Sequence, residues 1–320
     1  MVGKYKIIVK NRRVVFQLNI ERNITIIKGK SATGKTTLIN ALRNYEDLKE
    51  KSGVTISSAK ACHVLYGNDW QEKIAKWSDS FIFLDEGNEF IKSEDFAKAI
   101  KGTDNYYIIV TRENLYQLPY SVNSILELRK TTSRFKCTYN KTYPCYDKVE
   151  GFKERLKEFD DIITEDSNSG FDMFSAIANE NNIKCISANG KSNIYFCIDN
   201  NNAEKILVIA DGAALGAEME KIYNYYILHQ DKVVLYLPES FEWLIMSSGI
   251  VTDKEIEAIL KDTANYADTK KYLSWEQLFT KLLEDKTAGN FNQYHKKKLN
   301  KYYLQKENVD KIINKIEGYK

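Results

Sequence analysis

The chain has 320 residues, a length that corresponds to about two domains. Hydrophobic residues make up 43% of it and charged residues 28%, which allows sizeable apolar cores and excludes general disorder. The 47 Lys and Arg against 44 Asp and Glu give a net charge of +3, which argues neither for nor against a polyanionic partner. The 3 Pro and 15 Gly leave no room for a Pro-rich or Gly-rich linker between domains.

The sequence contains no run of about eighteen apolar residues, and its first residues, MVGKYKIIVKNRR, lack an apolar stretch of signal-peptide length. The five cysteines form no CxxC pair, which argues against a disulfide framework and a standard zinc site. We therefore expect a cytoplasmic protein with reduced cysteines and no membrane-spanning segment.

In the first half, short apolar and β-rich runs alternate with helical patterns. The predicted strands are 5–10, 14–20, 23–28, 81–84 and 106–110, of which the first two form a hairpin. Helix or turn is predicted over 35–44, 90–101 and 113–118. Continuous apolar runs are typical of buried parallel strands, so the alternation predicts an α/β layer.

A second alternation follows the segment 131–149, which is polar and β-prone, lacks a clear period and marks the boundary between the halves. A charged helix near 150–160 is predicted to lead into it. The predicted strands are 161–164, 183–187, 205–210 and 233–237. The predicted helices are 171–181, 191–202, 215–230 and most of 253–320.

The most specific motif is GKSATGKT at residues 29–36, which matches G-x-x-x-x-G-K-[ST]. The glycines let successive backbone N–H groups face a phosphate, and the following helix directs its positive end toward it. Lys35 is expected to reach the β- and γ-phosphates, and Thr36 to ligate Mg²⁺. The expected nucleotide-binding residues are Gly29, Lys30, Ser31, Ala32, Thr33, Gly34, Lys35, Thr36 and Thr37. The motif predicts a nucleotide site, with ATP and Mg²⁺ as its cofactors.

Two carboxylates follow the next predicted apolar strand. Asp85 is expected to associate with the metal, and Glu86 to act as the general base that polarises the attacking water. A kinase does not need that second acid, so the pair favours hydrolysis. Thr111 and Asn114, at the end of a further strand, are candidates for sensing the γ-phosphate.

This first region resembles the ATPase heads of the ABC type, including those of the overcoming-lysogenization-defect (OLD) family. Those heads also begin with antiparallel strands before the P-loop, as KYKIIVKNRRVVFQLNIERNITIIKG does here. The resemblance covers roughly residues 1–130. No LSGGQ-like signature lies between Thr37 and Ser80, so an ABC-style sandwich dimer is not implied, and a homo-oligomer stays open as a partner.

Three predicted strand ends in the second half carry acids or glycines, at residues 163–171, 187–194 and 207–216. In a parallel sheet, the loops after these strands emerge at one edge. Glu165 and Asp211 are then expected to share a hard divalent cation, for which oxygen ligands suit Mg²⁺.

That order resembles the TOPRIM domain of topoisomerases, primases and OLD-type nucleases. On this resemblance Glu165 takes the place of the family's glutamate and Asp211 that of its first aspartate, and both are implied to be catalytic metal ligands. Glu239 and Glu242, in the later segment PESFEWL, are further candidate ligands. Ala213 stands where the second aspartate belongs. The family's activity is Mg²⁺-dependent cleavage or transfer at nucleic-acid phosphodiesters.

The sequence therefore predicts an α/β protein in four segments. A P-loop NTPase domain with a parallel sheet and antiparallel amino-terminal strands occupies 1–135, and a connecting segment occupies 136–160. A smaller TOPRIM-like α/β domain occupies 161–250, and a helical, basic region occupies 251–320. The expected function is an ATPase coupled to a Mg²⁺-dependent nuclease of the OLD type, which the resemblance links to phage defence. Two alternatives stay open: an NTPase switch with an inactive binding module, and a P-loop phosphotransferase.

Basic residues gather near both ends of the sequence. Residues 291–320 contain eight lysines interleaved with Tyr294, Tyr302 and Tyr303. Lysines neutralise phosphates and tyrosines stack on bases, so DNA or RNA is a candidate partner beside the nucleotide. The simpler explanation of this pattern is a solvated helix face.

Overall fold

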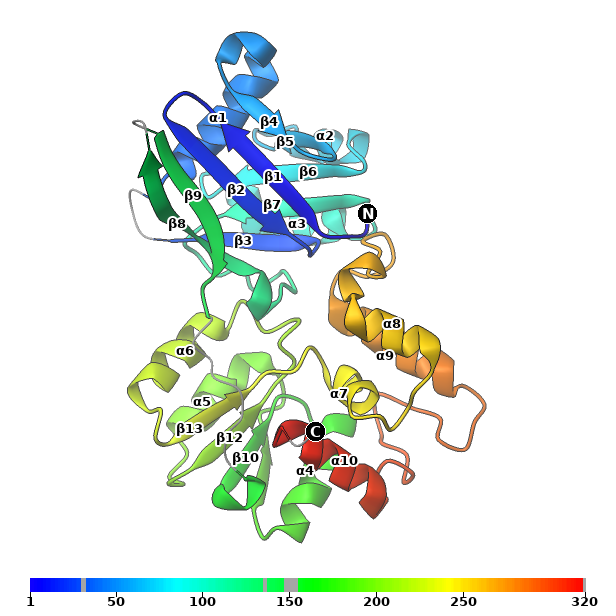
Figure 1. The fold of residues 1–320 in the computed structure, drawn as a ribbon. Helices are drawn as coiled ribbons and strands as arrows, with labels where there is room; N and C mark the ends of the chain where they lie inside the picture. The colour runs from blue at the N-terminus through cyan, green and yellow to red at the C-terminus, as the bar shows by residue number, and fades with distance from the viewer. Residues whose placement is uncertain (30–32, 135–136, 147–154, 319–320) are drawn as a thin grey trace. The chain divides into compact units, whose positions relative to one another are not determined.

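The computed structural model describes residues 1–29, 33–134, 137–146 and 155–318, which form two compact α/β units (Figure 1). The first unit comprises Met1–Tyr146 and Thr263–Ser274. The second comprises Asp147–Asp262 and Trp275–Lys320. The carboxyl-terminal region that the sequence set apart as one segment is thus divided between the two units.

The first unit is built on a nine-stranded mixed sheet in the order β4-β1-β2-β9-β8-β3-β7-β6-β5. Its strands are β1 (Tyr5–Lys10), β2 (Val14–Ile20), β3 (Ile24–Lys28), β4 (Thr55–Ser57), β5 (Ala61–Val64), β6 (Ser80–Asp85), β7 (Asn105–Val110), β8 (Ile125–Arg134) and β9 (Cys137–Pro144). Its α-helices are α1 (Lys35–Leu48), α2 (Trp70–Lys76) and α3 (Glu94–Ile100). The predicted hairpin is confirmed, because β1 and β2 have the predicted bounds and pair antiparallel.

The strands β8, β3, β7, β6 and β5 run parallel, and β3, β7 and β6 have buried apolar side chains on both faces of the sheet. Neighbouring residues of a strand point to opposite faces. Accordingly, Ile108 of β7 shares an apolar cluster with Leu38 of α1. The adjacent Tyr107 instead contacts Phe96 of α3, with ring centroids 6.1 Å apart. Full burial of each such side chain contributes roughly 1.5–3 kcal/mol.

The polar segment that the sequence analysis took as a boundary contains ordered strands. β8 and β9 pair antiparallel through it, and β9 also pairs with β2. The buried polar residues of β9 are accommodated by hydrogen bonds, since Thr142 Oγ1 accepts one from the Asn19 N–H at 3.2 Å. Apolar periodicity alone therefore underestimated the sheet, because polar side chains stand on it where partners satisfy them.

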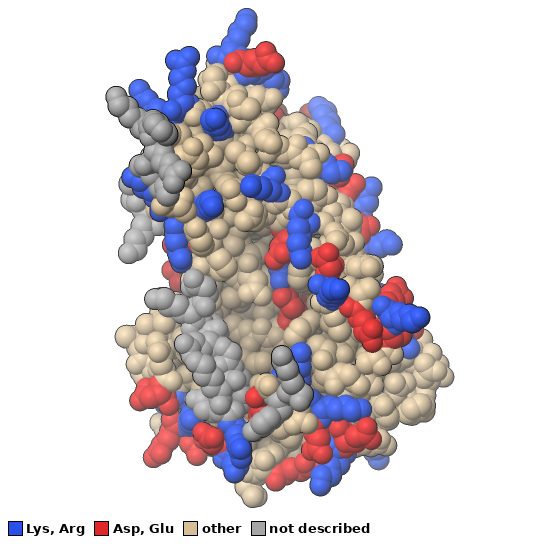
Figure 2. Space-filling model, viewed as in Figure 1, with Lys and Arg blue, Asp and Glu red and all other residues tan. Residues whose placement is uncertain are grey.

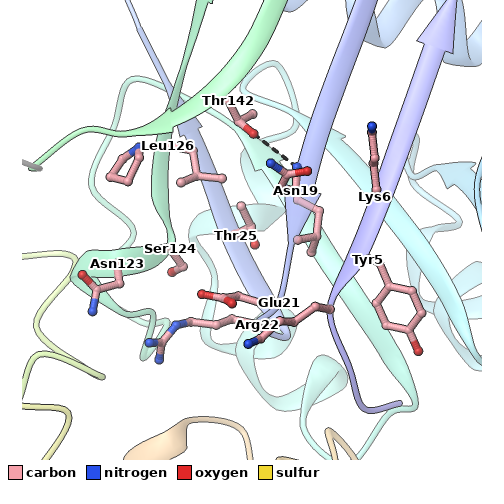
Figure 3. Close-up of a pocket in the computed structure, with 13 residues that line it drawn as sticks. Tyr5, Lys6, Asn19, Glu21, Arg22, Thr25, Asn123, Ser124, Leu126 and Thr142 are labelled. Atoms are coloured by element: carbon pink, nitrogen blue, oxygen red, sulfur yellow. Dashed lines mark hydrogen bonds between the residues drawn. The ribbon is translucent and has the colours of Figure 1, made fainter. Parts of the chain in front are cut away.

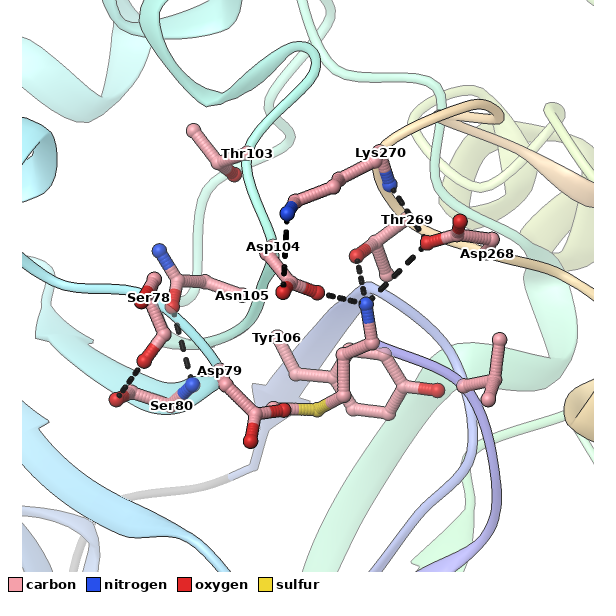
Figure 4. Close-up of polar contacts among 12 residues, drawn as sticks. Ser78, Asp79, Ser80, Thr103, Asp104, Asn105, Tyr106, Asp268, Thr269 and Lys270 are labelled. Atoms are coloured by element: carbon pink, nitrogen blue, oxygen red, sulfur yellow. Dashed lines mark hydrogen bonds and ion pairs between the residues drawn. The ribbon is translucent and has the colours of Figure 1, made fainter.

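The segment Thr263–Ser274 belongs to the first unit through contacts with the first residues of the chain. The Thr269 N–H donates to the Met1 carbonyl at 3.1 Å, and the Met1 amino group donates to Thr269 Oγ1 at 2.9 Å. Asp104 and Asp268 accept from the same amino group (Figure 4). The ammonium thus has three oxygen partners, which is what a buried cation requires.

The second unit contains a four-stranded, all-parallel sheet in the order β11-β10-β12-β13. Its strands are β10 (Asp161–Thr164), β11 (Lys184–Ser187), β12 (Ile206–Ile209) and β13 (Val233–Tyr236). Its α-helices are α4 (Ser169–Glu180), α5 (Ile194–Asp199), α6 (Met219–Leu228), α7 (Phe241–Ser247), α8 (Lys254–Lys261), α9 (Trp275–Thr287) and α10 (Lys306–Ile316). The predicted strand at 161–164 is confirmed residue for residue, and so is the parallel arrangement that brings its end beside that of β12.

Among the described residues of both units, no helix combines the length and the apolar character that crossing a bilayer requires.

Candidate functional site

Two described glycines of the turn between β3 and α1 have backbone conformations that favour glycine. Gly34 adopts φ 91° at the amino end of α1, and Gly29 adopts φ 143°, values that side-chain-bearing residues rarely reach. A Cβ atom at Gly34 would also lie 3.2 Å from the Phe16 ring. Three of the predicted nucleotide-binding residues, Lys30, Ser31 and Ala32, lie outside the described residues.

Lys35, the first residue of α1, is folded back onto this turn. Its Nζ donates to the Gly29 carbonyl at 2.6 Å and to Thr33 Oγ1 at 3.3 Å. Burial lowers the pKa of Lys35, the charge of Arg112 lowers it further, and Glu86 raises it. A carbonyl and a hydroxyl oxygen are thus among the groups that hold the ammonium at the turn. A charged phosphate oxygen makes a stronger hydrogen bond with an ammonium than a neutral oxygen does.

The strand register aligns the two predicted acids with this turn. Val110 of β7 lies opposite Ile27 of β3 on one side and opposite Asp85 of β6 on the other. Residues that directly follow these strands therefore emerge together at one edge. Glu86 and Lys35 line a single cavity of about 140 Å³, as do Asp85, Thr36 and Thr37. We call this cavity the phosphate pocket.

The residue after β7 that reaches the phosphate pocket is not one that the sequence singled out. Thr111 is 1% exposed and its Oγ1 accepts from the Glu113 N–H, while Asn114 accepts from Lys28 Nζ. Arg112 lines the pocket instead, and its backbone N–H donates to Glu86 Oε2 at 3.1 Å. Arg112, and neither Thr111 nor Asn114, is thus among the side chains that line this pocket.

In the second unit, two predicted acids meet at the ends of neighbouring strands. Thr164 of β10 lies opposite Ile209 of β12, so Glu165 and Asp211 follow at the same edge. The Asp211 N–H donates to Glu165 Oε2 at 3.0 Å, and Asp211 Oδ1 accepts from the Phe241 N–H at 3.0 Å. Both acids line a cavity of about 190 Å³, which we call the acidic pocket.

Burial dominates the electrostatics of this pair. It raises the pKa of Glu165 to about 7, against an ordinary 4.5. Burial also raises the pKa of Asp211 well above its usual range, and the neighbouring charge of Glu165 adds to that effect. Two buried carboxylates repel one another when both are ionised. Such a pair favours the binding of a positive charge beside it.

We expect the protein without divalent cations to lose stability between about pH 5 and about pH 8, and the Glu165→Gln variant to lose less. The raised pKa means that folded Glu165 keeps a proton that the unfolded chain releases. Stability from such a group is complete below the unfolded pKa and is lost as pH rises through the folded one. Thermal unfolding across this pH range, compared between the two proteins, measures the effect. Parallel pH profiles would contradict it.

Two residues of the acidic pocket were missed as site residues by the sequence analysis. Lys296 and Glu276 line it, with Nζ 2.6 Å from Glu276 Oε1. Burial lowers the pKa of Lys296, but the carboxylates of Glu276, Glu242 and Asp211 together raise it above its usual value. The sequence offered no signal for this role, because Lys296 stands among seven other lysines in a run that looks like a solvated surface.

Glu242 and Glu239, the two further candidate ligands, have different surroundings. Glu242 of α7 is 1% exposed, and its Oε1 accepts from the Tyr294 hydroxyl at 2.9 Å. Among the described residues, none donates a hydrogen bond to its Oε2. Glu239 does not line the acidic pocket, although its carbonyl accepts from the Ala213 N–H at 3.1 Å. Glu242 does not line that pocket either, but its negative charge adds to the effect of burial in raising the pKa of Asp211.

Only glycine fits at position 212, directly after Asp211, because there is no room for a side chain. A Cβ atom at Gly212 would lie 2.9 Å from the Leu237 carbonyl oxygen, closer than such contacts occur. The Gly212 N–H donates to the Pro238 carbonyl at 2.7 Å, so the loop after β12 lies directly against the loop after β13. This close approach fixes the backbone that carries Asp211.

Within the described ranges, no group of three or more His, Cys, Asp and Glu side chains is arranged to hold a metal ion. The hydroxyl and carboxylate side chains that line the two pockets include Thr36, Asp85 and Glu86 in the phosphate pocket and Glu165, Asp166, Asp211 and Glu276 in the acidic pocket.

The tyrosines of the basic carboxyl-terminal region do not form a base-stacking surface. Tyr294 and Tyr303 are 1% and 0% exposed, so two of the three predicted stacking residues belong to the core. Lys311 lies 3.1 Å from Glu307 on α10. In the lower part of the face shown in Figure 2, acidic side chains lie among the basic ones. These observations favour the solvated-face interpretation.

The largest cavity among these three lies elsewhere in the first unit. It measures about 460 Å³ and is lined by Lys4, Lys6 and Arg22, together with Glu21 (Figure 3). Thr25, near the start of β3, also lines it, whereas the phosphate pocket lies beyond the end of β3. The two cavities therefore lie at opposite ends of that strand.

No protein-family model matches the chain, and a search of curated proteins finds none that is similar to it.

Proposed function

We propose that the first unit binds and hydrolyses a nucleoside triphosphate, ATP being the expected one. The observation that carries this proposal is the phosphate pocket, in which Lys35, Asp85 and Glu86 converge at the carboxyl edge of one parallel sheet. A cation, a glycine turn and a helix amino end suit the phosphates. An acid beside them suits the activation of water.

The chain's own residues supply the following steps. The Lys35 ammonium exchanges its neutral oxygen partners for the β- and γ-phosphate oxygens. Glu86 accepts a proton from a water molecule whose oxygen bonds to the γ-phosphorus, while the bond from that phosphorus to the bridging oxygen breaks. Thr36 and Asp85 present hard oxygen donors in the same pocket and fit Mg²⁺. Bound there, the ion would neutralise phosphate charge.

Lys35→Ala is expected to lower affinity for ATP by about 30- to 1000-fold, the cost of truncating one partner of a buried charge pair, and to abolish turnover. Equilibrium binding of a fluorescent ATP analogue and phosphate release measure the two effects. Lys73→Ala is the matched control, because Lys73 is a lysine of the same unit that pairs with Asp69 outside the pocket. Intact turnover in Lys35→Ala would overturn the assignment of the nucleotide site.

For the second unit we propose a Mg²⁺-dependent site that cleaves nucleic-acid phosphodiesters, as the TOPRIM resemblance implies. The observation that favours it is a buried pair of acids, Glu165 and Asp211, with the Lys296 ammonium in the same cavity. Their raised pKa values fit a site for a divalent cation, which the two carboxylates would hold and which would stabilise the charge that develops on a phosphodiester. Lys296 would bind a phosphate oxygen of the substrate.

Coupling of the two activities in one OLD-like protein, and a role in phage defence, are proposals that rest on resemblance alone. The switch alternative predicts ATP hydrolysis with no cleavage of DNA or RNA. The phosphotransferase alternative predicts that the γ-phosphate appears on an acceptor instead of as inorganic phosphate, which the phosphate-release measurement distinguishes.

A further inference from the structure

Arg112 and Glu86, which both line the phosphate pocket of the first unit, form an ion pair. The Arg112 backbone N–H donates to Glu86 Oε2 at 3.1 Å, and the guanidinium Nε lies 3.9 Å from Oε1 of the same carboxylate. The proposed general base is thus engaged by both the backbone and the side chain of one residue.

The Arg112–Glu86 ion pair is weak enough for Arg112 to exchange Glu86 for another anion. Its side chains are 57% and 41% exposed, and an exposed pair of this kind contributes about 0–1 kcal/mol. A phosphate offers a guanidinium two oxygens in a matching plane and carries more charge, so an arginine–phosphate contact is the stronger one. Both side chains line the phosphate pocket with Lys35, which places the competing anion within the same cavity.

The position of Arg112 in the fold selects the terminal phosphate. Lys35 begins α1, directly after the turn that follows β3, whereas Arg112 follows β7, the next strand of the sheet. Glu86 follows β6, on the far side of β7. A group attached to β7 therefore emerges between the turn that holds the phosphate chain and the acid that activates water. That is where the γ-phosphate and the attacking water meet.

We propose that Arg112 is a γ-phosphate-binding residue of this chain, and that its guanidinium exchanges Glu86 for the γ-phosphate when a nucleoside triphosphate binds. This inference rests on the proposed nucleotide hydrolysis. The guanidinium of Arg112 would contact the γ-phosphate when a triphosphate is bound and Glu86 when a diphosphate is bound. Arg112 would thus distinguish ATP from ADP.

The test compares the affinities of AMPPNP and ADP, each with Mg²⁺, in wild type, Arg112→Ala and Arg112→Lys. Arg112→Ala is expected to weaken AMPPNP binding by about 10- to 100-fold, as for loss of a hydrogen-bonded charge contact, with ADP affinity unchanged. Arg112→Lys should retain part of the preference, because lysine keeps the charge without the planar fork. Arg129→Ala is the matched control, since Arg129 is also paired with a glutamate, Glu127, but lies outside the pocket.

A second measurement examines the release of Glu86. Glu86→Gln should tighten AMPPNP binding when Arg112 is present, because the guanidinium no longer leaves a charged partner, and should have no such effect in the Arg112→Ala background. Equal losses of AMPPNP and ADP affinity in Arg112→Ala, or no loss of either, would overturn the inference while leaving nucleotide binding intact. Failure of the wild type to bind either nucleotide would instead overturn the proposed function and the inference together.

Discussion

Glu86→Gln is expected to bind the nucleoside triphosphate at least as well as wild type and to hydrolyse it about 10²- to 10⁴-fold more slowly, the usual contribution of a general base. Glutamine keeps the shape of the side chain and an oxygen that can accept from the Arg112 N–H. It cannot take a proton from water. Phosphate release under saturating ATP, together with AMPPNP binding, separates the loss of chemistry from any loss of affinity.

The control for this prediction is Glu89→Gln. Glu89 lies three residues further along the chain, pairs with Lys92 and does not line the phosphate pocket. It should hydrolyse ATP at the wild-type rate. Unaltered hydrolysis in Glu86→Gln would exclude Glu86 as the base and would return the choice to another group at this sheet edge.

The second large effect is expected in the acidic pocket. Glu165→Ala and Asp211→Ala should each reduce plasmid cleavage in Mg²⁺ or Mn²⁺ by about 10²- to 10³-fold, the range seen when a group that stabilises transition-state charge is removed. The isosteric variants Glu165→Gln and Asp211→Asn should do the same without leaving a cavity. Glu180→Gln, which changes an exposed acid of the same unit, should cleave at the wild-type rate.

A readout besides cleavage keeps the metal assignment falsifiable. Mg²⁺ should raise the thermal stability of the wild-type protein, because a cation bound to folded Glu165 and Asp211 relieves their repulsion. Asp211→Asn should lose that stabilisation. Equal cleavage in wild type and both alanine variants would place the activity elsewhere. ATP hydrolysis without any cleavage would favour the switch with an inactive binding module.

Much of the local structure followed from short-range pattern. The bounds of β1, β2 and β10 were predicted residue for residue, because a run of apolar or β-branched residues between polar turns fixes the extent of a strand locally. The glycine turn before α1 was predicted for the same reason, since all of its determinants lie within the eight residues of the motif.

The composition of each pocket was only partly predictable. Glu165 and Asp211 are 46 residues apart in the sequence. The rule that parallel strands end at one edge of the sheet nevertheless predicted that the two acids lie close together. Lys296 and Glu276 lie outside that sheet, so no strand rule applied to them. Their place depends on how the chain after β13 packs against the unit, which sequence periodicity does not encode.

By itself, the sequence determined the two alternations of strand and helix and the acids at the strand ends, and it contains the G-x-x-x-x-G-K-[ST] pattern from which phosphate binding is proposed. Each of these features depends on neighbouring residues only. The tertiary structure decided that Arg112, rather than Thr111, faces Glu86, and that Lys296 enters an acidic cavity. It also assigned Thr263–Ser274 to the first unit. These outcomes depend on strand register and on contacts between distant segments. Such contacts form where apolar side chains become buried and charged groups find partners at the same time. No local sequence pattern specifies that condition.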